Sequence, residues 1–225
     1  MKLLVANPLY SPMAGPVSMG VQLSLQQRHP DWEIATIESC STALTYNFNR
    51  AWCAALNMRA TSGLTHFLMI HQDVRPRYPD FLDVMLDEMR QYGADILSAV
   101  IAIKSDQGLT STAVDTDLWR PQRLTLAEVH GYPKPTWTAP KLLINTGLML
   151  VDMCGDWVEK AFFTMTDKIE RNRKNGQWEA FVAPEDWNFS RLARSLGAKI
   201  YATRAVAVDH FGVSHWPNDP SDSPR

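Results

Sequence analysis

Two residues far apart in the chain, Asp73 and His210, have side chains suited to hold a divalent cation. Each lies shortly after an apolar run, where a buried strand would meet a polar loop. A carboxylate can take one oxygen position on Mg²⁺ or Mn²⁺ and leave others for phosphate oxygens, and an imidazole suits Mn²⁺ better than Ca²⁺. We therefore expect a shared metal site. Each residue alone is also explained as a turn or capping aspartate and a hydrogen-bonded surface histidine.

An acidic pair, Glu185 and Asp186, follows Pro184 at the predicted start of a helix. Acidic side chains in a first helical turn are stabilised by the helix dipole and by free backbone N–H groups, which would explain the pair without catalysis. In the functional interpretation, one of the two carboxylates is a general base that deprotonates an attacking hydroxyl. Asp186 is the first choice for this role and Glu185 the second.

The elements that must position these residues alternate between strand and helix in the first half of the chain. Short apolar runs predict strands at residues 2–6, 33–38, 66–70 and 95–103. Apolar residues at helical spacing predict helices at about residues 17–27, 44–58 and 82–92, the last closed by Gly93. This order implies a parallel sheet with right-handed crossovers, in which ligands bind beyond the carboxyl ends of the strands.

The second half of the chain departs from this rhythm. Residues 104–140 form a long polar segment, more than a simple connection needs, and such loops are often functional. Beyond it, the patterns predict strands at residues 142–151 and 199–208 and helices at residues 156–173 and 184–196. The rim of the sheet should bring together residues 7–10, 38–41, 71–73, 104–112 and His210 in one crevice.

Composition bounds the class of protein without choosing its chemistry. The 225 residues are 45% hydrophobic, enough for a sizeable core, and the formal net charge of -2 is unlike that of a general nucleic-acid binder. No apolar stretch approaches the ~20 residues of a membrane span. Three cysteines without a C-x-x-C pair indicate half-buried, reduced thiols in a cytoplasmic protein. We expect one domain over residues 1–215 and a flexible tail over residues 216–225.

The order of Asp73, the Asn-Thr-Gly segment at residues 145–147, the acidic pair and His210 resembles that of family-2-like GT-A glycosyltransferases of the small phage and bacterial type. The stretch at residues 184–197, with Phe189 and Arg191 after the acidic pair, is similar to the family's acidic-pair helix. The resemblance covers about residues 1–212. It implies a GT-A fold, which is a Rossmann-like α/β/α sandwich with a mostly parallel central sheet.

The resemblance also implies roles for individual residues. Asp73 matches the metal-binding acid of the family's D-x-D motif, but His71 replaces the first aspartate, so the metal dependence is in question. His210 would complete the site for Mn²⁺ or Mg²⁺. The residues implied in binding the nucleotide-diphosphate sugar are Asn7, Leu9, Tyr10, Glu38, Arg50, His71, Gln72, Asp73, Asn145 and Gly147. Arg120 and Arg123 could neutralise the diphosphate, although exposed arginines are usually only solvated.

If the resemblance holds, the protein is a metal-assisted, hexosyltransferase-like enzyme. It would move a sugar from the nucleotide-diphosphate sugar to a hydroxyl on a glycan, lipid or protein acceptor, with inversion. Two alternatives stay open. One is a catalytically degenerate module that binds nucleotide sugars, which the replacement at His71 keeps in play. The other is a nucleotidyltransferase on a related fold, which would be expected to carry a Gly-rich basic loop after the first strand, whereas residues 11–15 contain no Lys or Arg.

Overall fold

The computed structural model of this protein describes residues 1–9, 16–212 and 215–218. The helices are α1 (Pro16–Arg28), α2 (Leu44–Ser62), α3 (Phe81–Tyr92), α4 (Leu126–Gly131) and α5 (Glu185–Ser195), with a short 3-10 helix η1 (Asp156–Glu159). The strands are β1 (Lys2–Leu9), β2 (Glu33–Cys40), β3 (His66–Ile70), β4 (Val74–Pro76), β5 (Ile96–Ala99), β6 (Leu109–Val114), β7 (Gln122–Thr125), β8 (Thr136–Trp137), β9 (Leu142–Leu143), β10 (Leu148–Asp152), β11 (Thr166–Arg171), β12 (Trp178–Ala183), β13 (Ile200–Thr203), β14 (Val208–Phe211) and β15 (His215–Pro217).

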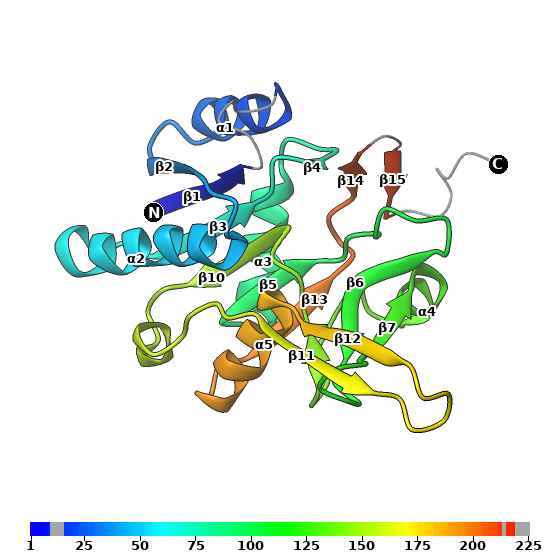
Figure 1. The fold of residues 1–225 in the computed structure, drawn as a ribbon. Coiled ribbons are helices and arrows are strands. Elements are labelled where there is room, and N and C mark those ends of the chain that lie inside the picture. Colours follow the sequence, from blue (N-terminus) through cyan, green and yellow to red (C-terminus); the bar gives the residue numbers. More distant parts are fainter. Residues whose placement is uncertain (10–15, 213–214, 219–225) are drawn as a thin grey trace.

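A seven-stranded sheet in the order β2-β1-β3-β10-β5-β13-β8 lies at the centre of the fold (Figure 1). β1 pairs in parallel with β2 and β3, and β5 pairs in parallel with β13, whereas β10 lies antiparallel between β3 and β5. Only β10 and β8 therefore run against the other five strands. The predicted α/β fold with a mostly parallel central sheet is confirmed.

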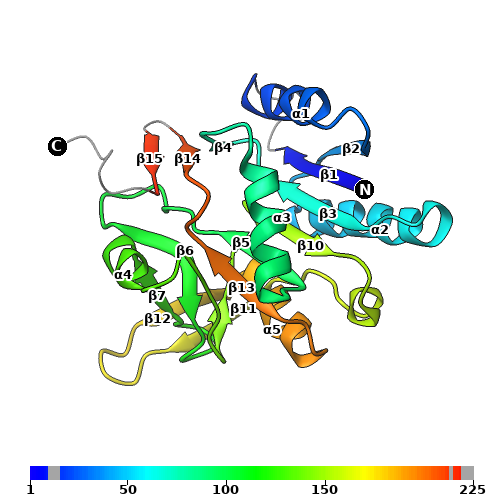
Figure 2. The same ribbon diagram turned by 180° about the vertical axis from the view of Figure 1, so that it is seen from behind.

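Helices cover both faces of this sheet (Figures 1 and 2). Successive side chains of a strand point to opposite faces, so Leu3 and Val5 of β1 join the core beneath α1 and α3, while Leu4 and Ala6 join the core beneath α2 and α5. In the second core, Trp52 of α2 packs edge-on against other aromatic rings, among them Phe189 of α5 at a centroid distance of 5.4 Å. This packing fixes α5 against the sheet.

The early elements agree with the sequence patterns because each has a clear period and a clear stop. α3 ends at Gly93, which adopts the left-handed conformation with φ of 60° and so closes the helix as predicted. β1 and β2 extend further than their predicted ends, to Leu9 and Cys40. The predicted strand at residues 95–103 is shorter, since only Ile96–Ala99 is in the sheet.

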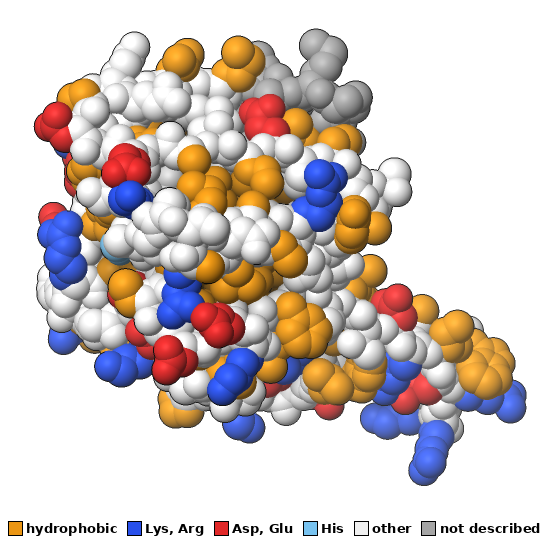
Figure 3. Space-filling view, turned by 90° about the vertical axis from the view of Figure 1, so that its left-hand side faces the viewer, with side chains coloured by type: hydrophobic (Ala, Val, Ile, Leu, Met, Phe, Trp, Pro, Cys, Tyr) orange, Lys and Arg blue, Asp and Glu red, His pale blue; other side chains and the backbone are white. Residues whose placement is uncertain are grey.

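The predicted helix over residues 156–173 is wrong. This region holds only η1, a connection and the strand β11, which pairs with β12 in a two-stranded hairpin. Phe162, Met165 and Ile169, expected on an inward helical face, are 51%, 51% and 72% exposed. The hairpin extends away from the body of the molecule (Figures 1 and 2), and the space-filling view shows a projecting arm on which hydrophobic side chains lie beside Lys and Arg (Figure 3).

The long polar segment at residues 104–140 is structured. It contains β6, β7, α4 and β8, and β6 pairs with β7 on one side and β9 on the other. α4 begins with a complete capping box, in which Thr125 and Glu128 each bond the backbone of the other. The segment thus builds a small second sheet against the rim where the candidate residues lie.

At the C-terminal side, the chain stays packed past residue 215. β15 runs to Pro217, and the buried Asn218 side chain bonds Val208, Val100 and Val206; the rest of the expected tail lies outside the described residues. The cysteines Cys40, Cys53 and Cys154 are exposed rather than half-buried. Within the described residues, no helix has the length and apolar character needed to cross a membrane.

Candidate functional site

The turn between β3 and β4 carries Asp73, whose carboxylate meets two side chains from distant parts of the chain. Oδ2 of Asp73 lies 3.5 Å from Nε2 of His210 in β14. The same atom accepts a hydrogen bond from the ammonium group of Lys104, which follows the end of β5. The Asp73, His210 and Lys104 side chains are 15%, 20% and 35% exposed. Asp73 and His210 thus lie side by side at one rim of the sheet, and Lys104 joins them.

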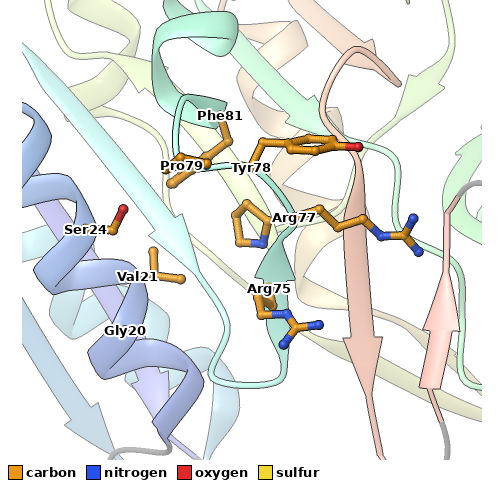
Figure 4. A pocket seen from close by; sticks show the side chains of 9 residues that line it. Gly20, Val21, Ser24, Arg75, Arg77, Tyr78, Pro79 and Phe81 are labelled. Atoms are coloured by element: carbon orange, nitrogen blue, oxygen red, sulfur yellow. The ribbon is translucent and has the colours of Figure 1, made fainter.

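Two arginines hold the strand that carries His210. Asp209 is buried, and its carboxylate accepts hydrogen bonds from Arg75 Nη2 at 2.8 Å and from Arg77 Nε at 2.7 Å. Both arginines border a hollow of about 400 Å³ between α1 and β4 (Figure 4). Because β14 also pairs with β4, His210 is fixed against the turn that carries Asp73.

The orientation of the His210 ring defines which nitrogen faces the carboxylate. Nδ1 lies 2.7 Å from the carbonyl oxygen of Ala102, and a carbonyl can only accept, so Nδ1 carries the proton. Nε2 then faces Asp73 either as a second N–H donor or as a lone pair. A lone pair beside a carboxylate needs a cation between them, which is the arrangement of a metal-ligating histidine whose other nitrogen is held by a backbone carbonyl.

Asp73 is the more strongly ionised of the candidate carboxylates. Burial opposes its ionisation, but hydrogen bonds from His210 and Lys104 outweigh burial and hold the pKa of Asp73 well below its usual range. Its second oxygen, Oδ1, is buried and has no hydrogen-bond partner among the described residues. A buried anionic oxygen without a partner is unusual, and a cation or a ligand donor would satisfy it.

The donor set fits a cation that is shared with a ligand. Among the described residues, no group of three or more His, Cys, Asp or Glu side chains could hold a metal ion. The protein therefore offers Oδ1 of Asp73 and, in the form of His210 in which Nε2 carries no proton, Nε2 of His210. Mg²⁺ and similar ions are often held by one or two protein ligands together with waters and substrate phosphates. Phosphate oxygens would supply the remaining positions.

The contacts of the His71 side chain are with Thr146 and Phe48. Its Nε2 lies 3.2 Å from Oγ1 of Thr146, and its ring packs against Phe48 at a centroid distance of 5.2 Å. Burial lowers the pKa of His71 to about 4, so the ring is neutral near pH 7. Its backbone N–H also donates to the carbonyl of Gly147. His71 therefore fixes the turn before Asp73 to the segment at residues 145–147.

The acidic pair lies at the first turn of α5, where the N-cap residue is Pro184 and Oδ1 of Asp186 accepts a hydrogen bond from the backbone N–H of Trp187 at 2.7 Å. Glu185 is buried and Asp186 is half-buried. Burial raises the pKa of Glu185, and burial together with the charge of Glu185 raises the pKa of Asp186 to about 8. A carboxylate with a pKa near the working pH is suited to proton transfer, which capping alone does not explain.

Arg123 is the cationic side chain whose charge acts on Asp186. Its charge lowers the pKa of Asp186, but less than burial raises it. The guanidinium donates from Nη1 to the carbonyl of Thr110 at 3.2 Å and lies 4.6 Å from the ring centroid of Trp187. Arg120, the other arginine considered from the sequence, instead pairs with Glu179 of the hairpin.

The segment between β9 and β10 connects the two groups of candidate residues. Ile144 N donates to Oγ of Ser190 in α5 at 3.1 Å. Two residues later, Thr146 contacts His71. Asn145 is buried, donates to the carbonyl of Ala99 at 2.8 Å and accepts from Gly147 N at 2.9 Å. Asn145 therefore organises the rim through hydrogen bonds of its own.

Gly147 lies in closely packed surroundings. A Cβ atom at this position would lie 2.5 Å from Cδ1 of Ile101. Ile101 adjoins Ala102, whose carbonyl holds His210, and its own carbonyl accepts from Ser111, which in turn accepts from the Trp187 ring. The two sites therefore share one short stretch of backbone.

The other residues predicted to bind the nucleotide sugar lie in β1, near the end of β2, on α2 and in the turn that carries Asp73. Asn7 and Leu9 are buried in β1, and Asn7 donates to the carbonyl of Ile70, so neither forms an open loop as expected. Glu38 is exposed at the end of β2, and Arg50 is exposed on α2; Glu38 accepts from Gln22 and Arg50 lies over Tyr46. Tyr10 lies outside the described residues, and Gln72 lies in the turn beside Asp73.

Lys104 was expected at this rim as the first residue of the segment 104–112, but the sequence assigned it no role. The available signal was its position directly after an apolar run, where polar residues of a sheet reach the ligand-binding rim. A lysine in a polar loop is far more often only solvated, so its partner could be found only from the fold.

No protein-family model matches this chain, and no curated protein matches it. Among solved structures, it is similar to A197 from STIV, with 16% identity and a TM-score of 0.55 over 94% of this chain and 86% of that one. It also matches a glycosyltransferase involved in the glycosylation of the major capsid of PBCV-1 at 10% identity, with a TM-score of 0.37 over 70% of this chain and 62% of that one. A complex of UDP-glucose pyrophosphorylase with UDP-glucose matches at 12% identity, with a TM-score of 0.42 over 90% of this chain and 89% of that one. The match to A197 shows the fold alone: a mixed α/β domain with a large, mostly parallel central sheet.

Proposed function

We propose that this protein transfers a sugar from a nucleotide-diphosphate sugar to a hydroxyl acceptor, with inversion at the anomeric carbon. One observation carries the proposal: two carboxylates at linked positions of one rim have opposite tendencies to ionise. Asp73 is a fixed anion, and Asp186 has a pKa of about 8. Environments that separate the pKa values of two acids in this way are typical of sites that divide binding and proton transfer between them.

Asp73 and His210 would bind the diphosphate end of the donor through the cation. When bound, a divalent cation would neutralise charge that grows on the departing nucleoside diphosphate, and Asp73 and His210 are the residues that would hold it. The buried and unpartnered Oδ1 of Asp73 supports this role. We also propose that the nucleoside is bound by Asn7, Leu9, Glu38 and Arg50.

Asp186 would act at the acceptor end. The acceptor oxygen bonds to the anomeric carbon as the bond from that carbon to the phosphate oxygen breaks. The electron pair of the broken bond leaves with the nucleoside diphosphate, and the hydroxyl proton passes to Asp186. Attack from the face opposite the leaving group inverts the anomeric centre. Glu185 keeps the pKa of Asp186 high through its negative charge.

A panel of nucleotide-diphosphate sugars, each tested with and without Mn²⁺, examines this proposal through release of the nucleoside diphosphate. Wild-type protein should turn over at least one donor, and Asp73→Ala should lose cation-dependent binding of the matching nucleoside diphosphate. Asp87→Ala is the control, since Asp87 is an exposed acid that pairs with Arg90 on α3. If the protein binds a donor tightly but never turns it over, it is a nucleotide-sugar-binding module and not an enzyme. Full Mn²⁺-dependent affinity in Asp73→Ala would refute the role of Asp73.

A further inference from the structure

The Asp73 carboxylate divides its two oxygens between very different surroundings. Oδ2 accepts the hydrogen bond from Lys104 and faces His210, while Oδ1 has no partner among the described residues. Lys104 is therefore a cation that already sits on the acid expected to bind a metal. No role in catalysis or binding has so far been assigned to Lys104.

The backbone around Lys104 holds the lysine at this place. Ile103 N donates to the carbonyl of Leu109 at 3.0 Å, and Ala102 bridges Thr110 in antiparallel fashion, so residues 104–108 form a short closed loop. The loop returns through Gly108 with a φ of 64°. The Lys104 side chain is 35% exposed and that of Asp73 only 15%, so more of the lysine than of the aspartate is open to solvent.

A divalent cation and Lys104 cannot both keep Asp73 as their main partner. Like charges close to one carboxylate repel each other, and a single carboxylate does not neutralise the three positive charges that they carry together. A diphosphate supplies several anionic oxygens and would accept both groups at once. The ammonium has three donors on a flexible stem, which suits it to move from Asp73 to a phosphate oxygen.

We propose, on the basis of the proposed function, that Lys104 is a diphosphate-binding residue which occupies Asp73 until the donor arrives. It would then release Asp73 to the cation and bond to a phosphate oxygen itself. The cation and the nucleotide would consequently bind together and only weakly one by one.

The test compares Lys104→Met, which keeps the aliphatic stem and removes the charge, with wild-type protein in two titrations. Mn²⁺ alone is followed by the electron paramagnetic resonance signal of the free ion. ADP, GDP, UDP and dTDP are titrated calorimetrically at saturating Mn²⁺. Lys104→Met should bind Mn²⁺ alone about three- to tenfold more tightly, because its competitor on Asp73 is gone. It should bind the preferred nucleoside diphosphate at least about tenfold more weakly.

Two further variants separate this role from a structural one. Lys104→Arg keeps the charge and should bind the nucleoside diphosphate nearly as wild type does. Lys174→Met, in the turn of the projecting hairpin, should change neither titration. Affinities for Mn²⁺ and nucleoside diphosphate that move in the same direction in Lys104→Met, or an unchanged Mn²⁺ affinity, would overturn the inference. If no nucleoside diphosphate binds wild-type protein, the proposed function fails, while the Mn²⁺ titration still decides whether Lys104 competes for Asp73.

Discussion

Asp73 and Asp186 are both removed from water, yet their environments drive their ionisation in opposite directions. Burial raises the pKa of each carboxyl group. At Asp73, hydrogen bonds from His210 and Lys104 reverse that effect. At Asp186, the nearest acid, Glu185, adds to burial, and the charge of Arg123 compensates only in part. The number and closeness of cationic partners, more than burial, separates the two acids.

This contrast matters because the two tasks need different acids. A carboxylate that binds a cation or a cationic side chain must stay ionised over the whole working range of pH. A carboxylate that takes a proton from a hydroxyl works best when its pKa is near that range. Substitution of Asp186, of Asn145 between the two sites, or of Arg123 near Asp186 should therefore change different quantities: the rate of transfer, the stability or the pH dependence.

Asp186→Asn should have the largest effect. The amide keeps the shape of the side chain but cannot accept the acceptor's proton, and loss of an aligned general base typically costs ~10²- to 10⁴-fold in rate. Transfer is measured as steady-state release of nucleoside diphosphate, and affinity for that nucleotide by calorimetry. Affinity should stay close to wild type. Equal losses of rate and affinity would contradict the division of labour between the two acids.

Asn145→Ala should weaken the connection between the two sites. The substitution removes the partner of the Gly147 N–H and one of two donors to the carbonyl of Ala99, which also accepts from Oγ of Ser98. A buried group left unsatisfied costs about 1–3 kcal/mol. Urea unfolding monitored by tryptophan fluorescence should report a loss of at least about 1 kcal/mol. Asn57→Ala on the exposed face of α2 is the matched control and should be close to neutral. A neutral Asn145→Ala would mean that the rim does not depend on this side chain.

Arg123→Met should shift the pH dependence of transfer. The base acts when deprotonated, so kcat/KM should rise with pH through about 8, the pKa of Asp186. Arg123 lowers that pKa, so its removal should move the rise to higher pH, by up to about one unit. Arg120→Met is the control, since Arg120 pairs with Glu179 on the hairpin. A shift toward lower pH would exclude Asp186 as the group that titrates.

The sequence predicts the parts of this molecule that repeat a simple pattern. The strand at residues 66–70 and the helix ending at Gly93 follow from apolar period and stop signal, and both are present. Asp73 and His210 meet as expected, although His210 lies within β14 of a separate small sheet and not at the end of a central strand. The rule that strand ends share a rim placed Lys104 there within residues 104–112, but its bond to Asp73 and the unpartnered oxygen of Asp73 could not be predicted, because they depend on which loops the fold brings together.

The error at residues 156–173 has a physical cause. Val158, Phe162, Met165 and Ile169 recur at helical spacing, but only Ile169 lies in β11, whose other residues are polar, so the local pattern gave no signal for a strand. The cross-strand partners of β11 lie in β12, after a turn at residues 172–177. Pairing with a later segment therefore outweighed the local pattern.

Substitutions on the outward face of this hairpin should have the smallest effect on stability. They also serve as controls for the comparison of Asp73 with Asp186. Ile169 and Trp178 are 72% and 71% exposed, so Ile169→Thr and Trp178→Thr, which keep strand propensity, should change the free energy of unfolding by less than about 0.5 kcal/mol. Phe181→Thr on the opposite face should cost more, because Phe181 packs between Lys168 and Arg120 at 4.8 Å from each.

Since β12 leads directly into α5, the pH profile of transfer in the two outward variants tests whether the pKa of Asp186 is set by its immediate surroundings. An unchanged profile in both outward variants is expected if burial at the first turn of α5 sets that pKa. A shifted profile would mean that the hairpin, and not the immediate surroundings of Asp186, makes the two acids differ.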